Sequence, residues 1–328
     1  MPRRATPLHP ETPIEIGLAA AIVSVERGAP QILVARDGDI NVLPSGSFDP
    51  LQHRTLEIGL RAFVTSQTEL GLGYVEQLYT FGDRGRHALP GDAAPHVVSI
   101  GYLALTRLHG DRKLPKGVSF QPWYRYFPWE DWRGGRPAIL DAAVLPRLLT
   151  WADDKSGEAE ERDRRALARH ERVKLCFGTD QSPWDEEKVL DRYELLYEAG
   201  LLAEAARDGR ETAVQQDAMP PLGEAFAFDH RRILATAMGR LRAKLKYRPV
   251  IFELMPETFT LTALQQTVEA ISGRHLHKQN FRRLVEGTAL VEPTGRLKTT
   301  GGRPAALFRF RREVLQERPA PGLRVGAR

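Results

Sequence analysis

The sequence predicts an α+β fold: a sheet crossed by one helix, then a block of helices, then a basic unit of two helices and a hairpin. Three observations predict it: β-branched runs in the first third, helical periodicity in the middle, and a surplus of Lys and Arg in the last third. The chain has 328 residues, 42% hydrophobic and 27% charged, which is typical of a globular protein of two or three domains.

Strand-like segments dominate the first region, residues 12–132. Residues 14–25 and 31–36 are apolar runs separated by the turn sequence ERGAP, and residues 96–108 are rich in β-branched and aromatic side chains. Between them, residues 55–70 have apolar side chains at helical spacing, and a further strand pattern follows. We therefore expect a sheet with one helix laid across it.

Helical patterns fill residues 133–220. In the last of them, Ser182 and Pro183 suit the start of a helix, and Gly200 suits the position after its end. The pattern predicts a helical insertion whose role the sequence leaves open. Residues 221–245 then contain a further helix, which we expect to link the insertion to the basic unit and to complete the first domain.

Charge is unevenly distributed along the chain. Residues 231–328 contain 20 Lys and Arg against 7 Asp and Glu, a net charge of +13, whereas residues 1–230 carry a net charge of −8. A basic third on an acidic body indicates contact with a polyanion, or else a solvated basic surface.

The basic unit, residues 246–315, has the order helix, short turn, helix, hairpin. Thr262 with Gln265 suggests a capping box at the first helix, and a Gly-containing turn leads into a second helix with Phe281 and Leu284 on its buried side. This order is typical of a winged helix-turn-helix domain, which binds double-stranded DNA.

Polar side chains of the second helix and of the hairpin loop are the candidate DNA contacts. Arg pairs with guanine, Asn or Gln with adenine, and glycines let the main chain approach phosphates closely. The predicted DNA-binding residues are Lys278, Gln279, Asn280, Arg282 and Arg283 on the helix, and Arg296, Lys298, Thr299, Thr300, Gly301, Gly302 and Arg303 in the hairpin.

Two sets of motifs carry a resemblance to a known family. The segments LPSGSFDP, LRAFVTSQTELGLGYVEQLYTFGDRGR and HVVSIGYLAL resemble a Nudix domain, which implies an α/β/α sandwich. The segments KQNFRRLVEGTALVEPTG and GGRPAALFRF resemble the Nudix-related transcriptional regulators of NAD metabolism, most like the NadQ-type branch related to NrtR. The resemblance covers residues 12–130 and 221–315. It implies a repressor of NAD biosynthesis genes.

The Nudix-like helix has lost the glutamates that hold metal in active Nudix enzymes. If Gly71 is taken as the terminal glycine of the motif, the metal positions are Thr65, Thr68 and Glu69. If QTEL replaces the usual E-T-G-L, they are Phe63, Ser66 and Gln67. At most one carboxylate remains in either register, and such a set binds magnesium poorly. We therefore expect no catalytic residues, no metal site, and a domain that binds a nucleotide without cleaving it.

The resemblance implies an effector such as NAD, ATP or ADP-ribose, and no required cofactor. The candidate effector-binding residues are Arg36, Ser45, Gly46, Arg84 and Arg86, since arginines suit phosphates. The aromatic run WYRYFPWEDW, residues 123–132, has two interpretations: it stacks on an adenine, or it forms a core edge or an interface patch.

The sequence also predicts the cellular compartment and the oligomeric state. No apolar run approaches the roughly 20 residues that span a bilayer, the N-terminal stretch lacks a secretion signal, and Cys176 is the single cysteine. We expect a cytoplasmic protein without membrane association. A two-fold symmetric operator requires a homodimer.

Two alternative functions remain open. One is a divergent Nudix hydrolase acting on ADP-ribose or a related nucleoside diphosphate. The other is a nucleotide-binding scaffold whose helical insertion recruits a protein.

Overall fold

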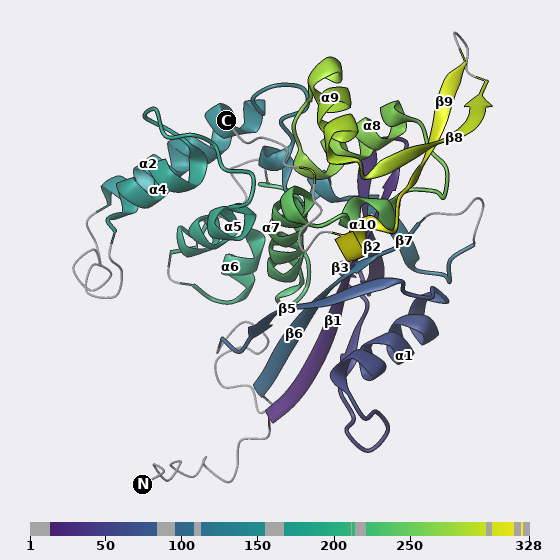
Figure 1. Cartoon of the computed structure of the whole chain (residues 1–328). Helices are drawn as coiled ribbons and strands as arrows, with labels where there is room; N and C mark the ends of the chain where they lie inside the picture. Colours follow the sequence, from purple (N-terminus) through teal and green to yellow (C-terminus); the bar gives the residue numbers. More distant parts are fainter. Residues whose placement is uncertain are drawn as a thin grey trace, which may run out of the picture.

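A mixed sheet lies at the centre of the computed structural model (Figure 1). Its strand order is β3-β2-β1-β6-β5, with β4 paired to β1 and β7 paired to β2. The central pair β1 and β6 is parallel, and the other pairs are antiparallel. The strands are β1 Ile14–Glu26, β2 Ala29–Asp37, β3 Ile40–Val42, β4 Ser45–Ser47, β5 Tyr74–Phe81, β6 His96–Leu105 and β7 Val118–Pro122.

The structure describes residues 14–83, 96–107, 113–154, 167–210, 212–213, 221–299, 304–317 and 323. Six predicted site residues lie outside these ranges: Arg84, Arg86, Thr300, Gly301, Gly302 and Arg303.

Helices cover both faces of the sheet, as the predicted α/β/α sandwich requires (Figure 1). Helix α1 (Leu56–Thr68) packs on one face, where Leu18, Ala20 and Ile22 of β1 meet Leu60 and Val64. The alternate residues of β1 enter the other core, which includes helix α7 (His230–Tyr247). Because β1 is buried on both faces, it reads as a continuous apolar run rather than an alternating one.

The helices described between residues 133 and 213 pack on the same core as α7. Its elements are a π-helical turn Leu140–Val144, α2 Leu145–Asp153, α4 Arg169–Phe177, α5 Val189–Glu198 and α6 Ala203–Arg207. Helix α5 lies beside α7, so the block is joined to the body through a shared apolar interface. Within the described ranges, every helix is too short or too polar to cross a bilayer.

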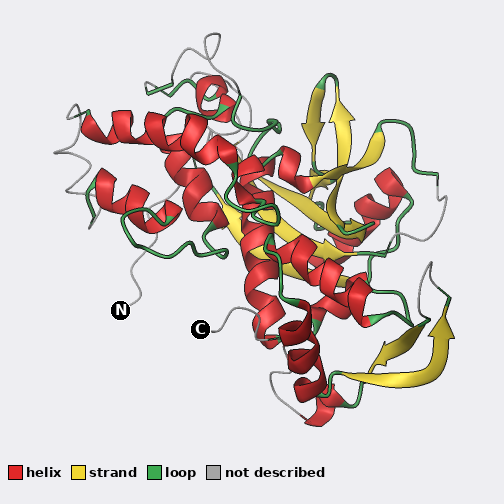
Figure 2. Cartoon of the chain, turned by 90° about the horizontal axis from the view of Figure 1, so that it is seen from above, coloured by secondary structure: helices red, strands yellow, loops and turns green. Residues whose placement is uncertain are grey.

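The C-terminal unit has the predicted winged-helix order, and its hairpin projects from the body in both views (Figures 1 and 2). Its elements are a 3-10 turn Val250–Leu254, α8 Leu261–Ser272, α9 Lys278–Thr288, β8 Val291–Lys298, β9 Ala305–Phe310 and α10 Val314–Glu317. Main-chain hydrogen bonds between Phe259 and Phe308 attach the hairpin to the segment before α8.

Two predicted helix starts are wrong, and each error has a physical reason. Helix α8 is capped by the Thr260 hydroxyl, which accepts a bond from the Ala263 amide at 3.1 Å, so the cap precedes Thr262. Helix α5 begins at Val189 and not near Ser182, because the carbonyl groups just before it accept bonds from buried arginines. The predicted end is correct, since Gly200 is left-handed with φ 72°.

Candidate nucleic-acid interface and nucleotide cavity

Helix α9 has one apolar face and one polar face. Phe281 and Val285 are buried and Leu284 is half-buried, which fixes the helix against the rest of the unit. The opposite face is solvent-exposed over all five predicted contacts, Lys278, Gln279, Asn280, Arg282 and Arg283. Asn280 lies on this exposed side with the four others.

The wing is a two-stranded hairpin whose register runs from Val291 opposite Phe310 to Lys298 opposite Ala305. Its outer end exposes Arg296, Lys298 and Thr299, together with an apolar residue that the sequence analysis did not single out, Leu297, which is 67% exposed. An apolar side chain between two cations suits contact with the sugar edges of a groove.

The exposed cations that the structure describes on α9 and at the outer end of the wing are not paired with described carboxylates. Among the described residues, no carboxylate lies within ion-pair distance of Lys278, Arg282, Arg283, Arg296 or Lys298. Arg309, at the base of the hairpin, is different: its Nε donates to Glu292 Oε1 at 2.6 Å. Uncompensated exposed cations make a surface that attracts phosphates.

Ser45 and Gly46 line a cavity of about 180 Å³ on the α7 side of the sheet. The Gln67 amide donates to the Ser45 carbonyl at 2.7 Å, which fixes this strand to α1. The cavity is also lined by Glu15, Gly17, Leu18, Ala19, Ser47, Val97, Ser99, Phe228 and His230. The structure thus brings two of the predicted effector residues together with the start of α7. Arg36 is exposed at the end of β2 and does not line the cavity.

Helix α1 ends in a left-handed residue, Glu69, with φ 57°. A glycine commonly occupies this position, and the Nudix motif has one there. The only carboxylate elsewhere on the helix, Glu57, is paired with Arg61 at 2.9 Å. No group of three potential metal-ligating side chains occurs within the part of the chain that the structure describes.

The aromatic run of residues 123–132 is part of the core. Trp123, Tyr126, Phe127 and Trp129 are all fully buried. Of the two interpretations of this run, the core edge is therefore correct, and none of these four rings is available to stack on an adenine.

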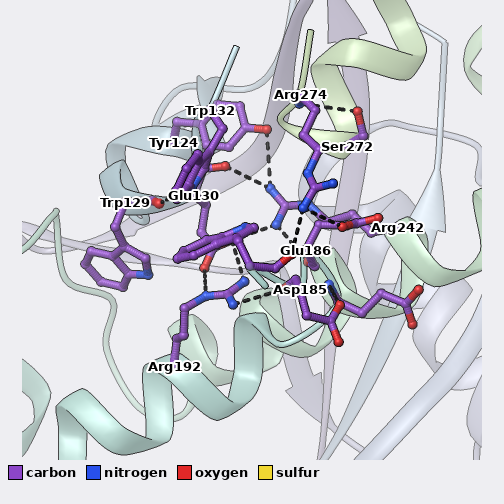
Figure 3. Close-up of polar contacts among 12 residues, drawn as sticks. Tyr124, Trp129, Glu130, Trp132, Asp185, Glu186, Arg192, Arg242, Ser272 and Arg274 are labelled. Atoms are coloured by element: carbon purple, nitrogen blue, oxygen red, sulfur yellow. Dashed lines mark hydrogen bonds and ion pairs between the residues drawn. The ribbon is translucent and has the colours of Figure 1, made fainter. Parts of the chain in front are cut away.

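A buried polar network, which no local sequence pattern indicates, lies beside these aromatics (Figure 3). Glu130, fully buried, accepts bonds from Arg192 Nε at 2.6 Å and Arg242 Nη1 at 2.6 Å. Burial alone would raise the pKa of Glu130, but the two arginines outweigh it and hold that pKa below its ordinary value. The network joins the aromatic run, α5 and α7.

Three comparisons with known proteins address this architecture. Residues 251–310 match the model of the NrtR DNA-binding winged helix domain. A curated relative, the "ADPR responsive transcriptional repressor NtrR" of Acinetobacter baylyi, is 45% identical over 85 residues. That match covers 26% of this chain and 34% of the relative, so the chain spans about a third of its length.

Solved structures extend the likeness in fold to the whole chain. NrtR of Shewanella oneidensis in complex with a 27mer DNA aligns with a TM-score of 0.51 at 19% identity, over 92% of this chain and 95% of that one. The same protein without DNA aligns with a TM-score of 0.51 at 20% identity, over 91% and 94%. As predicted, this protein is similar to the Nudix-related NrtR-type regulators, in sequence over its winged-helix domain and in fold over the whole chain.

Proposed function

We propose that this protein is a DNA-binding transcriptional repressor of NAD biosynthesis genes that responds to ADP-ribose or a related adenine nucleotide. It acts as a homodimer, with one α9 helix in the major groove of each half of a two-fold operator. The wing contacts the backbone or the minor groove beside it. The domains divide this work: residues 12–132 with 221–245 sense the nucleotide, and residues 246–315 bind DNA.

One observation carries the DNA-binding part of the proposal. The segment that matches the NrtR winged-helix domain exposes five cations on α9 and the wing, none of them paired with a described carboxylate. A folded unit gains nothing in stability from such a surface. Phosphate contact accounts for it, and the Arg, Gln and Asn side chains of α9 supply base-reading groups.

The cavity at Ser45 and Gly46 is the proposed effector site. It lies beside β4 and the start of α7, and its lining includes Ser45, Ser47 and Ser99. The curated relative is described as responsive to ADPR, which favours ADP-ribose over NAD and ATP as the first ligand to test.

We further propose that the domain does not hydrolyse its ligand. The left-handed Glu69 at the end of α1 favours the register in which Phe63, Ser66 and Gln67 occupy the glutamate positions. A phenyl ring, a hydroxyl and an amide cannot neutralise the charge of a divalent ion as carboxylates do. The expected result is no release of AMP from ADP-ribose with magnesium or manganese. Turnover above background would favour the hydrolase instead.

DNA binding is tested by fluorescence anisotropy with the DNA upstream of the chain's own gene and with promoters of NAD synthesis genes. We expect a salt-dependent complex that prefers one of these duplexes over a shuffled sequence of the same composition. Titration with ADP-ribose, NAD and ATP then identifies the effector. An absence of sequence preference at low ionic strength would contradict the proposed function.

A further inference from the structure

Hydrogen-bond donors of the body bind the carbonyl groups at the end of α8. These bonds attach the turn of the helix-turn-helix unit to the body. The Tyr124 hydroxyl donates to the Ala270 carbonyl at 2.8 Å, and Arg242 Nε donates to the Ile271 carbonyl at 3.0 Å. The Trp132 amide donates to the Gly273 carbonyl at 2.8 Å. These groups are left without intrahelical partners at the end of α8, so the body completes the helix.

The end of α8 is tightly packed against the body at this contact. Gly273 is left-handed with φ 72°, and a Cβ added there would lie 2.6 Å from the Glu130 carbonyl oxygen. Glu130 itself is held by Arg192 and Arg242, as Figure 3 shows. The end of α8 is therefore in direct contact with Arg242 and its partners.

Helix α7 connects this contact with the nucleotide cavity. His230 at its first residue lines the cavity, and its Nδ1 accepts a bond from the Leu43 amide at 3.0 Å. Arg242 follows 12 residues later, which is about 18 Å along the helix axis. Ten side chains of α7 are buried, from His230 to Leu245, so the helix is a tightly packed element between the two sites.

Helix α8 passes its orientation on to α9. The Gln265 amide donates to the Leu276 carbonyl at 2.8 Å, and the Leu276 amide donates to Glu269 Oε1 at 2.8 Å. These bonds tie α8 to the residues just before α9. A tilt of α8 thus changes where α9 points.

We propose that Tyr124, Glu130 and Arg242 are positioning residues that transmit the state of the cavity along α7 to the helix-turn-helix unit. The inference rests on the proposed function, because it requires a nucleotide in the cavity to alter operator affinity. Occupancy that displaces His230 moves Arg242, and Arg242 with Tyr124 resets the end of α8. The coupling therefore depends on hydrogen bonds far from both ligands.

The test compares two tyrosines in the full-length chain. Tyr124→Phe removes one hydroxyl that bonds to α8, whereas Tyr197→Phe removes one that bonds to Asp208 at 2.9 Å inside the helical block. Both tyrosines are buried, at 8% and 4% exposure. Arg242→Lys is a second variant, which keeps the positive charge but loses the planar guanidinium group and its several hydrogen-bond donors.

The readout is the factor by which saturating ADP-ribose changes the operator Kd, whether it raises or lowers that Kd. We expect Tyr124→Phe to reduce this ratio by about threefold and Arg242→Lys to bring it near one, with Tyr197→Phe unchanged. The Kd for ADP-ribose of the DNA-free protein should stay at the wild-type value in Tyr124→Phe, which a general loss of structure would not allow.

Two outcomes would overturn the inference, and they are distinguishable. If wild-type protein responds to ADP-ribose and Tyr124→Phe responds equally, the positioning role is wrong while the proposed function stands. If wild-type operator affinity does not change with ADP-ribose, the proposed effector response fails and the inference fails with it.

Discussion

The arginines of α9 and those of the buried network are the same residue type in opposite surroundings. Arg282 and Arg283 are exposed, and no described carboxylate pairs with them. Arg192 and Arg242 are at most 2% exposed, and each is bonded to Glu130 and to main-chain carbonyls. The first pair is available to a ligand, whereas the second pair is engaged in hydrogen bonds within the folded protein.

The comparison teaches that a count of positive charge does not locate a binding surface. Arg242 contributes to the net charge of +13 in the last third of the chain, yet it is buried and paired with the carboxylate of Glu130. What distinguishes the proposed DNA-binding face is the absence of ion-pair partners among the described residues, and only tertiary contacts decide that.

Removing the shared carboxylate should have the largest effect on stability. Glu130→Ala leaves two buried guanidinium groups without their anion, and we expect a loss of about 3–5 kcal/mol in the free energy of unfolding. Urea denaturation measures it. Glu224→Ala is the control, because its pair with Arg125 is 40–49% exposed and should contribute under ~1 kcal/mol. Equal small losses would mean that the buried network is dispensable.

Substituting the glycine at the end of α8 should have the next largest effect. Gly273→Ala and Gly295→Ala impose similar backbone strain, since the two φ angles are 72° and 73°. Only Gly273 faces a main-chain oxygen at 2.6 Å, whereas nothing lies within 4 Å of a Cβ at Gly295. Gly273→Ala should therefore lower stability by about 1–3 kcal/mol more than Gly295→Ala. Equal melting temperatures would contradict the close contact.

On the exposed side, Arg282→Ala should weaken operator binding by about 1–3 kcal/mol and relax specificity at one base pair, with no change in stability. Arg309→Ala is the matched control, because that arginine is already paired with Glu292. Anisotropy against a panel of single-base operator variants measures both. A uniform loss on every duplex would assign Arg282 to a phosphate.

The smallest effect is expected from the wing. Lys298→Ala should reduce the slope of log Kd against log salt by about one, because it removes one phosphate contact. Titrations at four salt concentrations measure the slope. An unchanged slope would place Lys298 outside the DNA interface, and the wing would then act through Arg296 or through residues beyond those described.

Much of the fold was predictable because the core patterns are local. The strands β1, β2, β5 and β6 and the helix α1 follow from apolar runs and helical spacing that tertiary packing did not override. The short strands β3, β4 and β7 were not predicted, because three to five residues carry too little pattern. The start of α5 was missed because Arg192 and Arg242 bind carbonyls that a helix would otherwise use.

The sequence by itself determined the winged-helix order, the basic face of α9 and the altered Nudix-like helix, since each depends on residue identity at short, regular spacing. Only the tertiary structure decided which arginines are neutralised, that Ser45 and Gly46 share a cavity with His230 while Arg36 does not, and that Gly273 lies against Glu130. Those contacts join residues more than sixty positions apart in the chain, and no local pattern encodes a meeting at such a separation.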